Sequence, residues 1–200
     1  MNARAETYKH IQAVQRLLGR CVRNLLVRGE VHDASKLESP EVEIFEVATE
    51  KLAALTYGSD EYKSALAEMK PALAHHYSNN RHHPEYFDCW ECPQCHRRYT
   101  KDDVPEIGYP QSDARWCLDC FGGEFPGFFE LALLNPKGGI GGMTLLDLVE
   151  MLCDWKAATM RHNDGSILRS IEINQERFGY GDELKQILRN TVSEIESAEK

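Results

Sequence analysis

Two pairs of cysteines constrain this 200-residue chain more than any other feature. Cys92 and Cys95 form one C-x-x-C unit, Cys117 and Cys120 form a second, and 21 residues separate the two units. Each C-x-x-C turn directs both of its sulfurs at the same ion, so two turns can surround Zn²⁺ with four thiolates. The sequence therefore predicts a structural zinc ion bound by these four cysteines.

The predicted zinc unit spans residues 88–121, where helical periodicity is lost and the pattern resembles a zinc ribbon. Strand-like pieces are expected at 98–100 and 115–116, and Cys89 and His96 are not needed as ligands. A closed four-thiolate site leaves no coordination position for a substrate, so its expected role is to stabilise the fold.

The rest of the chain has the periodicity of amphipathic helices. The expected class is all-α, a helical body formed by residues 1–87 and 122–200 with the zinc unit inserted once. The predicted helices cover residues 5–28, 39–55, 61–77 with a bend near Pro71, 145–162, 166–178 and 182–196.

Charge and composition exclude several classes of protein. The net charge is −9, and the predicted zinc unit itself has four basic and seven acidic residues. Nucleic-acid binding is therefore disfavoured, because phosphate contacts depend on lysine and arginine. The chain shows no secretory signal and no apolar run of the roughly 20 residues that a membrane span requires. Its seven cysteines are an odd number, which argues against a framework of disulfide bonds. We therefore expect a cytoplasmic metalloprotein.

Histidines and carboxylates in the helical body suggest a second metal site. Neutral imidazole and carboxylate groups bind borderline divalent metals such as Zn, Mn, Fe, Co or Ni. His32 directly precedes Asp33, and four further histidines lie within eleven residues. These four are His75, His76, His82 and His83.

Helical phase selects among the candidate ligands. His10 shares a face with apolar residues of the first predicted helix, and His76 shares a face with apolar residues of the third. Asp147, Glu150 and Asp154 lie on one face of the 145–162 helix. We therefore expect His10 and His76 to point inward. One such residue alone has little weight, because a buried histidine is usually structural and an acidic stripe usually faces solvent.

The ordered set resembles the HD superfamily of metal-dependent phosphohydrolases, which are all-helical. That family binds metal through a histidine on an early helix, an adjacent His-Asp pair and a later aspartate. Here His10, His32, Asp33 and Asp154 match in order, with Asp147 as the alternative for the last position. The motifs H-D-x-S-K, H-H-x-x-N-x-x-H-H-P-E and E-M-x-C-D-W also resemble a group of bacterial and phage HD-like proteins.

The resemblance implies a divalent metal in the body and hydrolysis of a small phosphorylated substrate, with a nucleotide expected. Asp33 and Lys36 are the implied catalytic residues. His76, Arg81, His82 and His83 are candidates for contacting substrate or a second metal. The general base is not identified by the sequence, because Lys36 occupies the turn where some relatives carry a glutamate.

Two other functions compete with the enzyme. A non-catalytic adaptor would use the zinc unit to present Tyr99, Tyr109, Trp116 and Phe121 to a protein partner, and it would need only the ribbon ion. A nucleic-acid binder is the third hypothesis, which the acidic charge weakens. Arg16, Arg20 and Arg23 form a basic stripe on the first predicted helix. We interpret this stripe as a solvent-exposed helix face, in preference to an anion-binding surface. The sequence leaves a homo-oligomer open.

Overall fold

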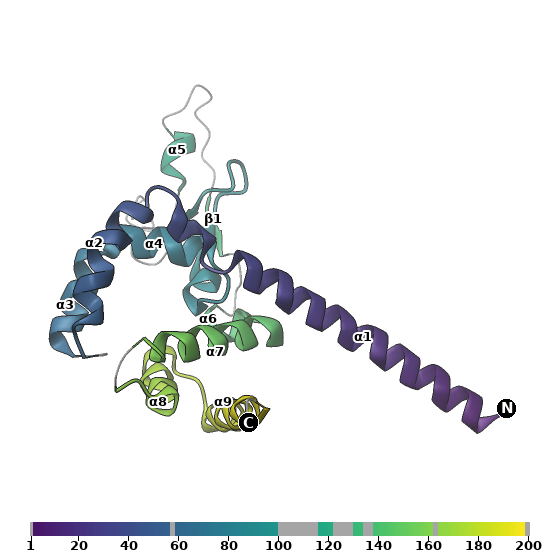
Figure 1. Ribbon diagram of the computed structural model, residues 1–200. Coiled ribbons are helices and arrows are strands. Elements are labelled where there is room, and N and C mark those ends of the chain that lie inside the picture. The colour runs from purple at the N-terminus through teal and green to yellow at the C-terminus, as the bar shows by residue number, and fades with distance from the viewer. Residues whose placement is uncertain are drawn as a thin grey trace.

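The computed structural model describes residues 2–56, 59–99, 116–121, 130–133, 138–161 and 164–198 of the chain. Most of these residues are helical, and a small antiparallel sheet is inserted between helices (Figure 1). The predicted all-α class with one small inserted unit is confirmed. In the described residues, no helix has the length and apolar character needed to cross a membrane.

The long helices begin and end close to their predicted bounds. Thr144 and Ser166 cap their helices as side-chain acceptors, because both hydroxyls accept a backbone N–H of the first turn. The helices are α1 Ala3–Val31, α2 Val42–Ala53, α3 Asp60–Glu68, α4 Lys70–Asn79, α5 Leu118–Phe121, α6 Gly139–Gly142, α7 Leu145–Thr159, α8 Ile167–Phe178 and α9 Asp182–Ala198. Two 3-10 helices are η1 Ala34–Leu37 and η2 Pro84–Asp88.

The predicted third helix is two helices. Met69 separates α3 from α4, and Pro71 lies in the first turn of α4. Proline is tolerated in a first turn because its missing N–H would have no helical partner there. The expected bend near Pro71 is therefore a complete helix boundary.

The apolar core of the body lies among α7, α8 and α9. Trp155 of α7 stacks on Phe178 of α8, and the Tyr180 hydroxyl donates to the Ile171 carbonyl at 2.5 Å. The buried members of this core are Met151, Leu152, Trp155, Ile167, Ile171, Tyr180, Leu188 and Val192. The core places one face of α7 against α8 and α9, which leaves its acidic face for the rest of the body.

The inserted sheet has three strands in the order β2-β1-β3, and both pairings are antiparallel. The strands are β1 Trp90–Glu91, β2 Arg98–Tyr99 and β3 Ala132–Leu133. Trp90 lies opposite Tyr99 on one side and Leu133 on the other. The unit therefore extends past the predicted end at residue 121. Residues 100 and 115 and Tyr109 fall outside the described residues.

Asp147 connects three parts of the chain at the start of α7. Its carboxylate accepts from the Thr144 backbone and hydroxyl, which completes a capping box. The same carboxylate accepts from Arg28 of α1 at 2.6 Å and from the Arg81 Nε at 2.8 Å. Burial acts to raise the pKa of Asp147, but the hydrogen bonds from Arg81, Arg28 and Thr144 hold it well below its ordinary value.

The segment after α4 is held in place where the backbone at Gly138 passes close to Asp88. The short helix α6 packs on η2, and Gly138 precedes it with a φ of 52°. A Cβ on Gly138 would lie 2.2 Å from Asp88 Oδ1, so this position requires glycine. Because η2 begins directly after His83, this packing fixes the end of the histidine-rich segment.

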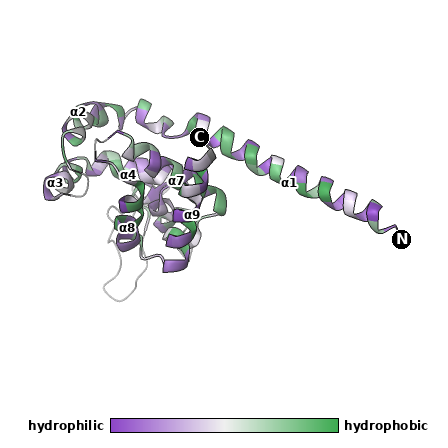
Figure 2. Cartoon of the chain, turned by 60° about the horizontal axis from the view of Figure 1, so that its bottom comes forward, coloured by the Kyte–Doolittle hydropathy of each residue, from purple (hydrophilic) through white to green (hydrophobic). Residues whose placement is uncertain are grey.

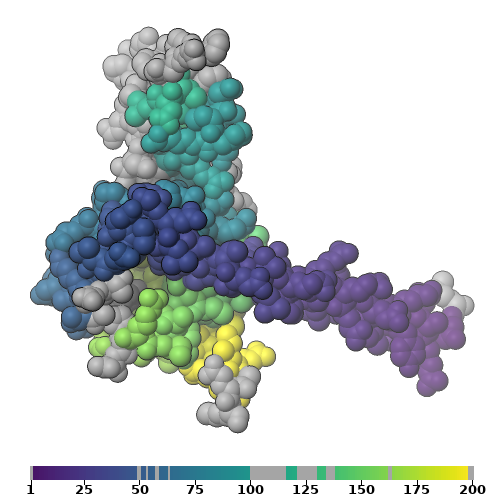
Figure 3. Space-filling view, turned by 45° about the horizontal axis from the view of Figure 1, so that its top comes forward, coloured from purple at the N-terminus to yellow at the C-terminus, as the bar shows by residue number. Residues whose placement is uncertain are grey.

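Helix α1 leaves the body as a single rod. The space-filling view shows its N-terminal part projecting beyond the other elements (Figure 3), and none of its residues is buried. Its ion pairs to the body are made by Arg28, near its C-terminal end, with Asp147 and Glu150.

Replacing Asp147 with asparagine is expected to destabilise the protein. The variant removes a buried charge that two arginines and a helix N-terminus share, so we expect a loss of about 3 kcal/mol in unfolding free energy at pH 7. Chemical denaturation measures this loss. Asp182→Asn is the matched control, because Asp182 also opens a helix but is exposed, and it should cost far less than Asp147→Asn.

The pH dependence gives a second check on the same variant. A folded-state pKa below the ordinary value stabilises the protein above that value, and this stabilisation is lost as pH falls. The difference between wild type and Asp147→Asn should therefore be full at pH 7 and shrink below about pH 4. A constant difference from pH 7 to pH 3 would contradict the ionised carboxylate.

Candidate metal centres

The four cysteines of the two C-x-x-C units converge in the inserted unit. Their four Sγ atoms all lie within 4.8 Å of one another; the residues are Cys92, Cys95, Cys117 and Cys120. The Cys92 and Cys120 sulfurs are 3.8 Å apart, and those of Cys95 and Cys117 are 3.5 Å apart. Tetrahedral zinc with bonds near 2.3 Å places its sulfurs about 3.8 Å apart. The four thiols therefore fit a zinc ion.

The surroundings of the cysteines suit a structural site. Cys92 and Cys117 are buried in a small core with Tyr99, whose hydroxyl lies 3.3 Å from the Cys117 sulfur. His96 has a φ of 58°, and its amide donates to the Cys92 carbonyl, which closes the first turn. The His96 ring is exposed and contacts Glu91 instead of the cysteines.

A second cluster surrounds Asp33, the residue after the His32 C-cap of α1. Asp33 has a φ of 57°, a left-handed conformation that is uncommon outside glycine and that is found often at functional sites. Its Oδ1 lies 3.3 Å from His76 Nε2 and 3.4 Å from His82 Nε2. His83 joins them, since its Nε2 is 2.9 Å from that of His76. One carboxylate and three imidazoles thus meet at one point.

The polar atoms of this cluster are poorly satisfied by the protein alone. Asp33 Oδ1 and His82 Nε2 are buried and have no hydrogen-bond partner among the described residues. Buried polar atoms without partners are rare and are expected where an ion binds. Metal bonds of 2.0–2.1 Å place neighbouring ligand nitrogens about 2.9 Å apart at right angles and about 3.4 Å apart in a tetrahedron. The observed separations of 2.9 to 3.4 Å fit such a polyhedron.

A third group adjoins the second and shares Asp33 with it. His32 Nε2 lies 3.5 Å from Asp154 Oδ1 and 3.7 Å from Asp33 Oδ2. The Asp154 carboxylate, together with Asp33 and Glu150, raises the pKa of His32 to about 9, although burial opposes the rise. His32, Asp33 and Asp154 could hold a second ion, with the two Asp33 oxygens facing different groups. Asp33 therefore contributes one carboxylate oxygen to each of the two groups.

Charge distinguishes the members of the cluster. Burial acts to raise the pKa of Asp33, but neighbouring His76, His82 and Lys36 outweigh it and hold the pKa well below its ordinary value. Burial lowers the pKa of His83, and the nearby His82 and His76 add to this effect. At neutral pH Asp33 is thus an ionised carboxylate and His83 is a neutral imidazole, which are the forms that bind metal.

Two glutamates orient the imidazoles from outside the cluster. Glu41 is fully buried and accepts from His75 Nδ1 at 2.6 Å and from His76 Nδ1 at 2.9 Å. Glu150 lies 3.1 Å from His32 Nδ1 and 3.4 Å from His82 Nδ1. Contacts of this kind fix a histidine tautomer and leave Nε2 available as the ligand atom.

The site has a buried side and an accessible side. His76 and His82 are 1% and 2% exposed, while the side chains of Lys36 and His32 are 31% and 25% exposed. Lys36 Nζ lies 2.6 Å from Asp33 Oδ2. A small anion approaching from solvent therefore meets Lys36 before it meets the inner histidines.

The structure assigns other roles to two of the predicted site residues. Arg81 binds Asp147 with two nitrogens and lies over the rings of Tyr86 and Phe87. It therefore anchors the histidine segment to α7 and is not in the metal cluster. Asp147, the alternative to Asp154, is engaged by arginines and by the helix N-terminus, so the carboxylate beside His32 is that of Asp154.

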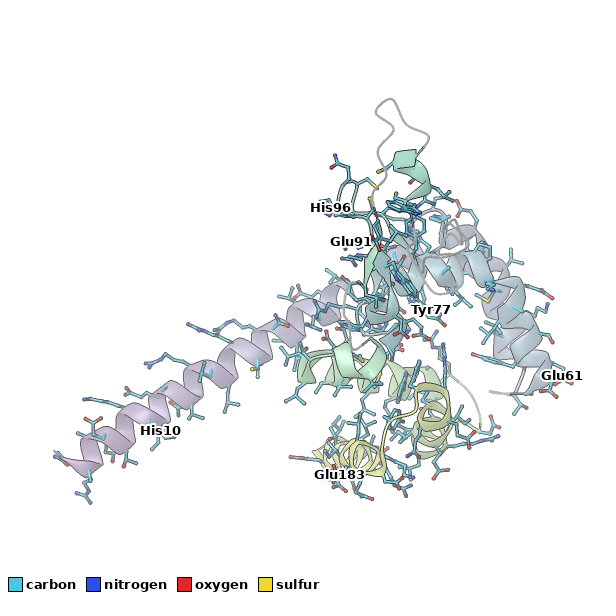
Figure 4. All side chains as sticks on the ribbon, turned by 180° about the vertical axis from the view of Figure 1, so that it is seen from behind. His10, Glu61, Tyr77, Glu91, His96 and Glu183 are labelled. Carbon is cyan, nitrogen blue, oxygen red and sulfur yellow. The ribbon has the colours of Figure 1, made fainter. Side chains whose placement is uncertain are left out.

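The predicted role of His10 needs correction. Helix α1 is continuous from Ala3 to Val31, so 22 residues of helix rise place His10 about 33 Å from His32. Figure 4 shows His10 on the projecting part of α1, far from the body. It is exposed instead of inward-facing, and the histidines that lie beside Asp33 are His76, His82 and His83.

Sequence reasoning missed Glu41 and the orienting role of Glu150. The signal for Glu150 was its place one turn before Asp154 on the acidic face of α7. Glu41 follows a proline at a helix start, where an acidic residue is expected for helix capping alone. Its burial depends on contacts with His75, His76 and Ser35 from other segments, which no local pattern reveals.

Replacing Glu41 with glutamine is expected to weaken metal binding without removing a ligand. The neutral amide holds the His75 and His76 rings less firmly, so affinity for a divalent ion in the body should fall about 10-fold or more. Titration of metal-free protein with Mn²⁺ or Co²⁺ measures this affinity. Glu43→Gln, an exposed neighbour on α2, is the control, and equal affinities in the two variants would contradict the orienting role.

Comparison with known proteins gives a family match. A family of unknown function, DUF5662, matches residues 1–107 and 126–198 of the chain. All residues of the body cluster lie in the matched part, as do Cys92 and Cys95, whereas Cys117 and Cys120 lie in the unmatched stretch. No curated protein and no solved structure matches the chain.

Proposed function

We propose that this chain, which belongs to the DUF5662 family of unknown function, is a metal-dependent phosphohydrolase acting on a small phosphorylated substrate, with a nucleotide expected. The observation that supports it best is the shared carboxylate of Asp33. It lies between His76, His82 and His83 on one side and His32 and Asp154 on the other. Adjacent ions joined by a carboxylate are common in enzymes that cleave phosphoesters.

The donor set suits hydrolytic chemistry at borderline divalent metals. Imidazole nitrogens and carboxylate oxygens favour Zn, Mn, Fe, Co or Ni over metals that prefer thiolates or oxygen alone. When bound, such ions lower the pKa of a coordinated water and polarise a phosphoryl oxygen. The protein contributes ligands that Glu41 and Glu150 hold in place before substrate arrives.

Lys36 is the proposed contact for the substrate phosphate. It is the nearest cation to Asp33, and its partial exposure places its ammonium at the accessible side of the cluster. The ring of Phe45 lies 5.1 Å from Nζ and limits the directions that the side chain can take. A held ammonium stabilises charge that develops on phosphoryl oxygens during hydrolysis. Asp33 and Lys36 are thus the proposed catalytic pair, and the proposal leaves the general base open.

The inserted zinc unit has a separate proposed role. Its four thiols fill one tetrahedral set, and it is built on its own three-stranded sheet. Arg98 Nη1 contacts the Ser78 carbonyl, which links the unit to α4. The unit therefore supports the helix that carries His75 and His76, and the proposed chemistry takes place in the body.

A phosphate-release screen tests the proposed function. Full-length protein loaded with Mn²⁺, Zn²⁺ or Co²⁺ would be incubated with nucleoside mono-, di- and triphosphates and with p-nitrophenyl phosphate. Lys36→Ala should lower kcat/KM for the best substrate about 10²- to 10³-fold with metal content unchanged. Lys51→Ala is the control, because Lys51 is exposed on α2 and pairs with Glu68 instead.

Two results of this screen would contradict the proposal, and a third would place the activity outside the body metal site. One is the absence of phosphate release from every substrate by protein that holds metal in the body. The other is equal activity of Lys36→Ala and Lys51→Ala, which would remove Lys36 from the phosphate site. Release that survives loss of the body metal would also assign the activity elsewhere.

A further inference from the structure

Helix α1 carries an apolar face that the described structure does not cover. Figure 2 shows hydrophobic bands along the projecting part of α1. Leu17, Leu18 and Val22 are 58%, 59% and 54% exposed, and no residue of the helix is buried. Exposed apolar surface of this extent on one element marks an interaction surface.

The helix itself needs such a contact. An isolated helix is marginally stable in water, and most helices in proteins depend on the packing of an apolar face. Gly19 and Gly29 lie within α1, and each weakens a helix because glycine loses more backbone freedom than other residues. The rod seen in Figure 1 is therefore expected to persist only when its apolar face is packed.

The spacing of the apolar residues indicates another helix as the covering surface. Residues at alternating steps of three and four form the central seam, which is the pattern of a coiled coil. This seam consists of Ile11, Val14, Leu18, Cys21 and Leu25. Tyr8, Leu17 and Val22 widen it on both sides, which suits a paired helix better than a single shallow contact.

Charge favours a second copy of this chain as the partner. Between Ala3 and Val31 there are six basic and two acidic residues, a net of +4. The whole chain has 23 basic and 32 acidic residues, so the remainder has 17 and 30, a net of −13. The helix is basic and the rest of the chain is acidic. The two charges are therefore complementary between copies when α1 of one copy extends toward the body of the other.

We propose that α1 pairs antiparallel with α1 of a second copy, forming a two-fold symmetric dimer whose axis passes beside Arg16. In this register the two helices are in contact along the whole projecting part of α1. The first turn of the partner's helix then lies beside Arg28, where α1 meets the body. Val14 packs on the partner's Leu18, Ile11 on the partner's Cys21, and Tyr8 on the partner's Val22. Each contact occurs twice, as a two-fold interface requires.

An anionic membrane is the main alternative occupant. A basic amphipathic helix can lie on anionic lipid, but this one has no tryptophan or phenylalanine to enter the interface. The acidic remainder of the chain would also be repelled by such a surface. The regular three-and-four seam is not needed for membrane contact, so the observations favour the dimer.

Light scattering on the full-length chain tests the dimer. We expect a mass twice that of the 22.8 kDa chain. Leu18→Glu places a carboxylate at the centre of the seam and should raise the dimer dissociation constant at least about 100-fold. Arg20→Ala is the matched control, because it makes the same one-unit change in net charge on the opposite face and should leave the mass unchanged.

Two outcomes would overturn the dimer. A single-chain mass for wild type at all concentrations rules out the pairing, and flotation of that monomer with phosphatidylserine vesicles would identify a membrane as the occupant. A dimer unaffected by Leu18→Glu would place the interface away from α1. Circular dichroism and zinc content must match wild type in the Leu18→Glu protein, so that loss of the dimer is not loss of the fold.

Cross-linking tests the antiparallel direction. Gln15 lies beside the proposed axis, so Gln15→Cys should form a disulfide with its own copy under mild oxidation. Val22 is six residues from the axis, which places the two copies of position 22 about 18 Å apart, and Val22→Cys should not cross-link to itself. Equal cross-linking of both variants would show a parallel pair and overturn the proposed arrangement.

Discussion

Buried carboxylates determine how the helical body is put together. A carboxylate removed from water stays ionised only if cations, hydrogen-bond donors or metals surround it. Asp147 meets this requirement with Arg28, Arg81 and the first turn of α7, and so joins α1, the histidine segment and α7. Glu41 meets it with imidazoles from α4. The positions of the helices around the site follow from these pairings.

Asp33 is a partly buried carboxylate whose partners are incomplete. Its Oδ2 is held by Lys36, but its Oδ1 has no hydrogen-bond partner among the described residues. The imidazoles around it present ring nitrogens at metal-ligand separations, and their other nitrogens are held by Glu41 and Glu150. Holding these ligand atoms close together without an ion costs free energy, so their orientation indicates that an ion binds there. The proposed function depends on this ion.

Local patterns in the sequence predicted much of the fold. Thr144, Ser166 and the helical periodicity gave the long helices within a few residues, and the C-x-x-C units predicted the cysteine cluster. The pattern predicted a bend near Pro71, where the chain has a complete boundary between α3 and α4. The strand at Ala132–Leu133 was missed, because it forms by pairing with the distant strand Trp90–Glu91. Helical phase is a local signal too, and for His76 it agreed with burial.

The site was predictable only in part. The His32-Asp33 pair and Asp154 lie beside His76, His82 and His83, which the sequence had singled out. His10 was placed wrongly because phase says which face a residue occupies and not whether that face meets the body. Glu41 was missed because its contacts with His75 and His76 come from 34 and 35 positions away. Tertiary contacts of this length are absent from any window of sequence.

Metal stoichiometry is the most direct test of the body site. Elemental analysis would compare wild type with a His32→Ala/Asp33→Ala variant, each incubated with Mn²⁺ and freed of excess metal. We expect zinc in both proteins and at least one further divalent ion per chain in wild type alone. One zinc per chain in both proteins would contradict the body site and favour a protein that uses its zinc unit without catalysis.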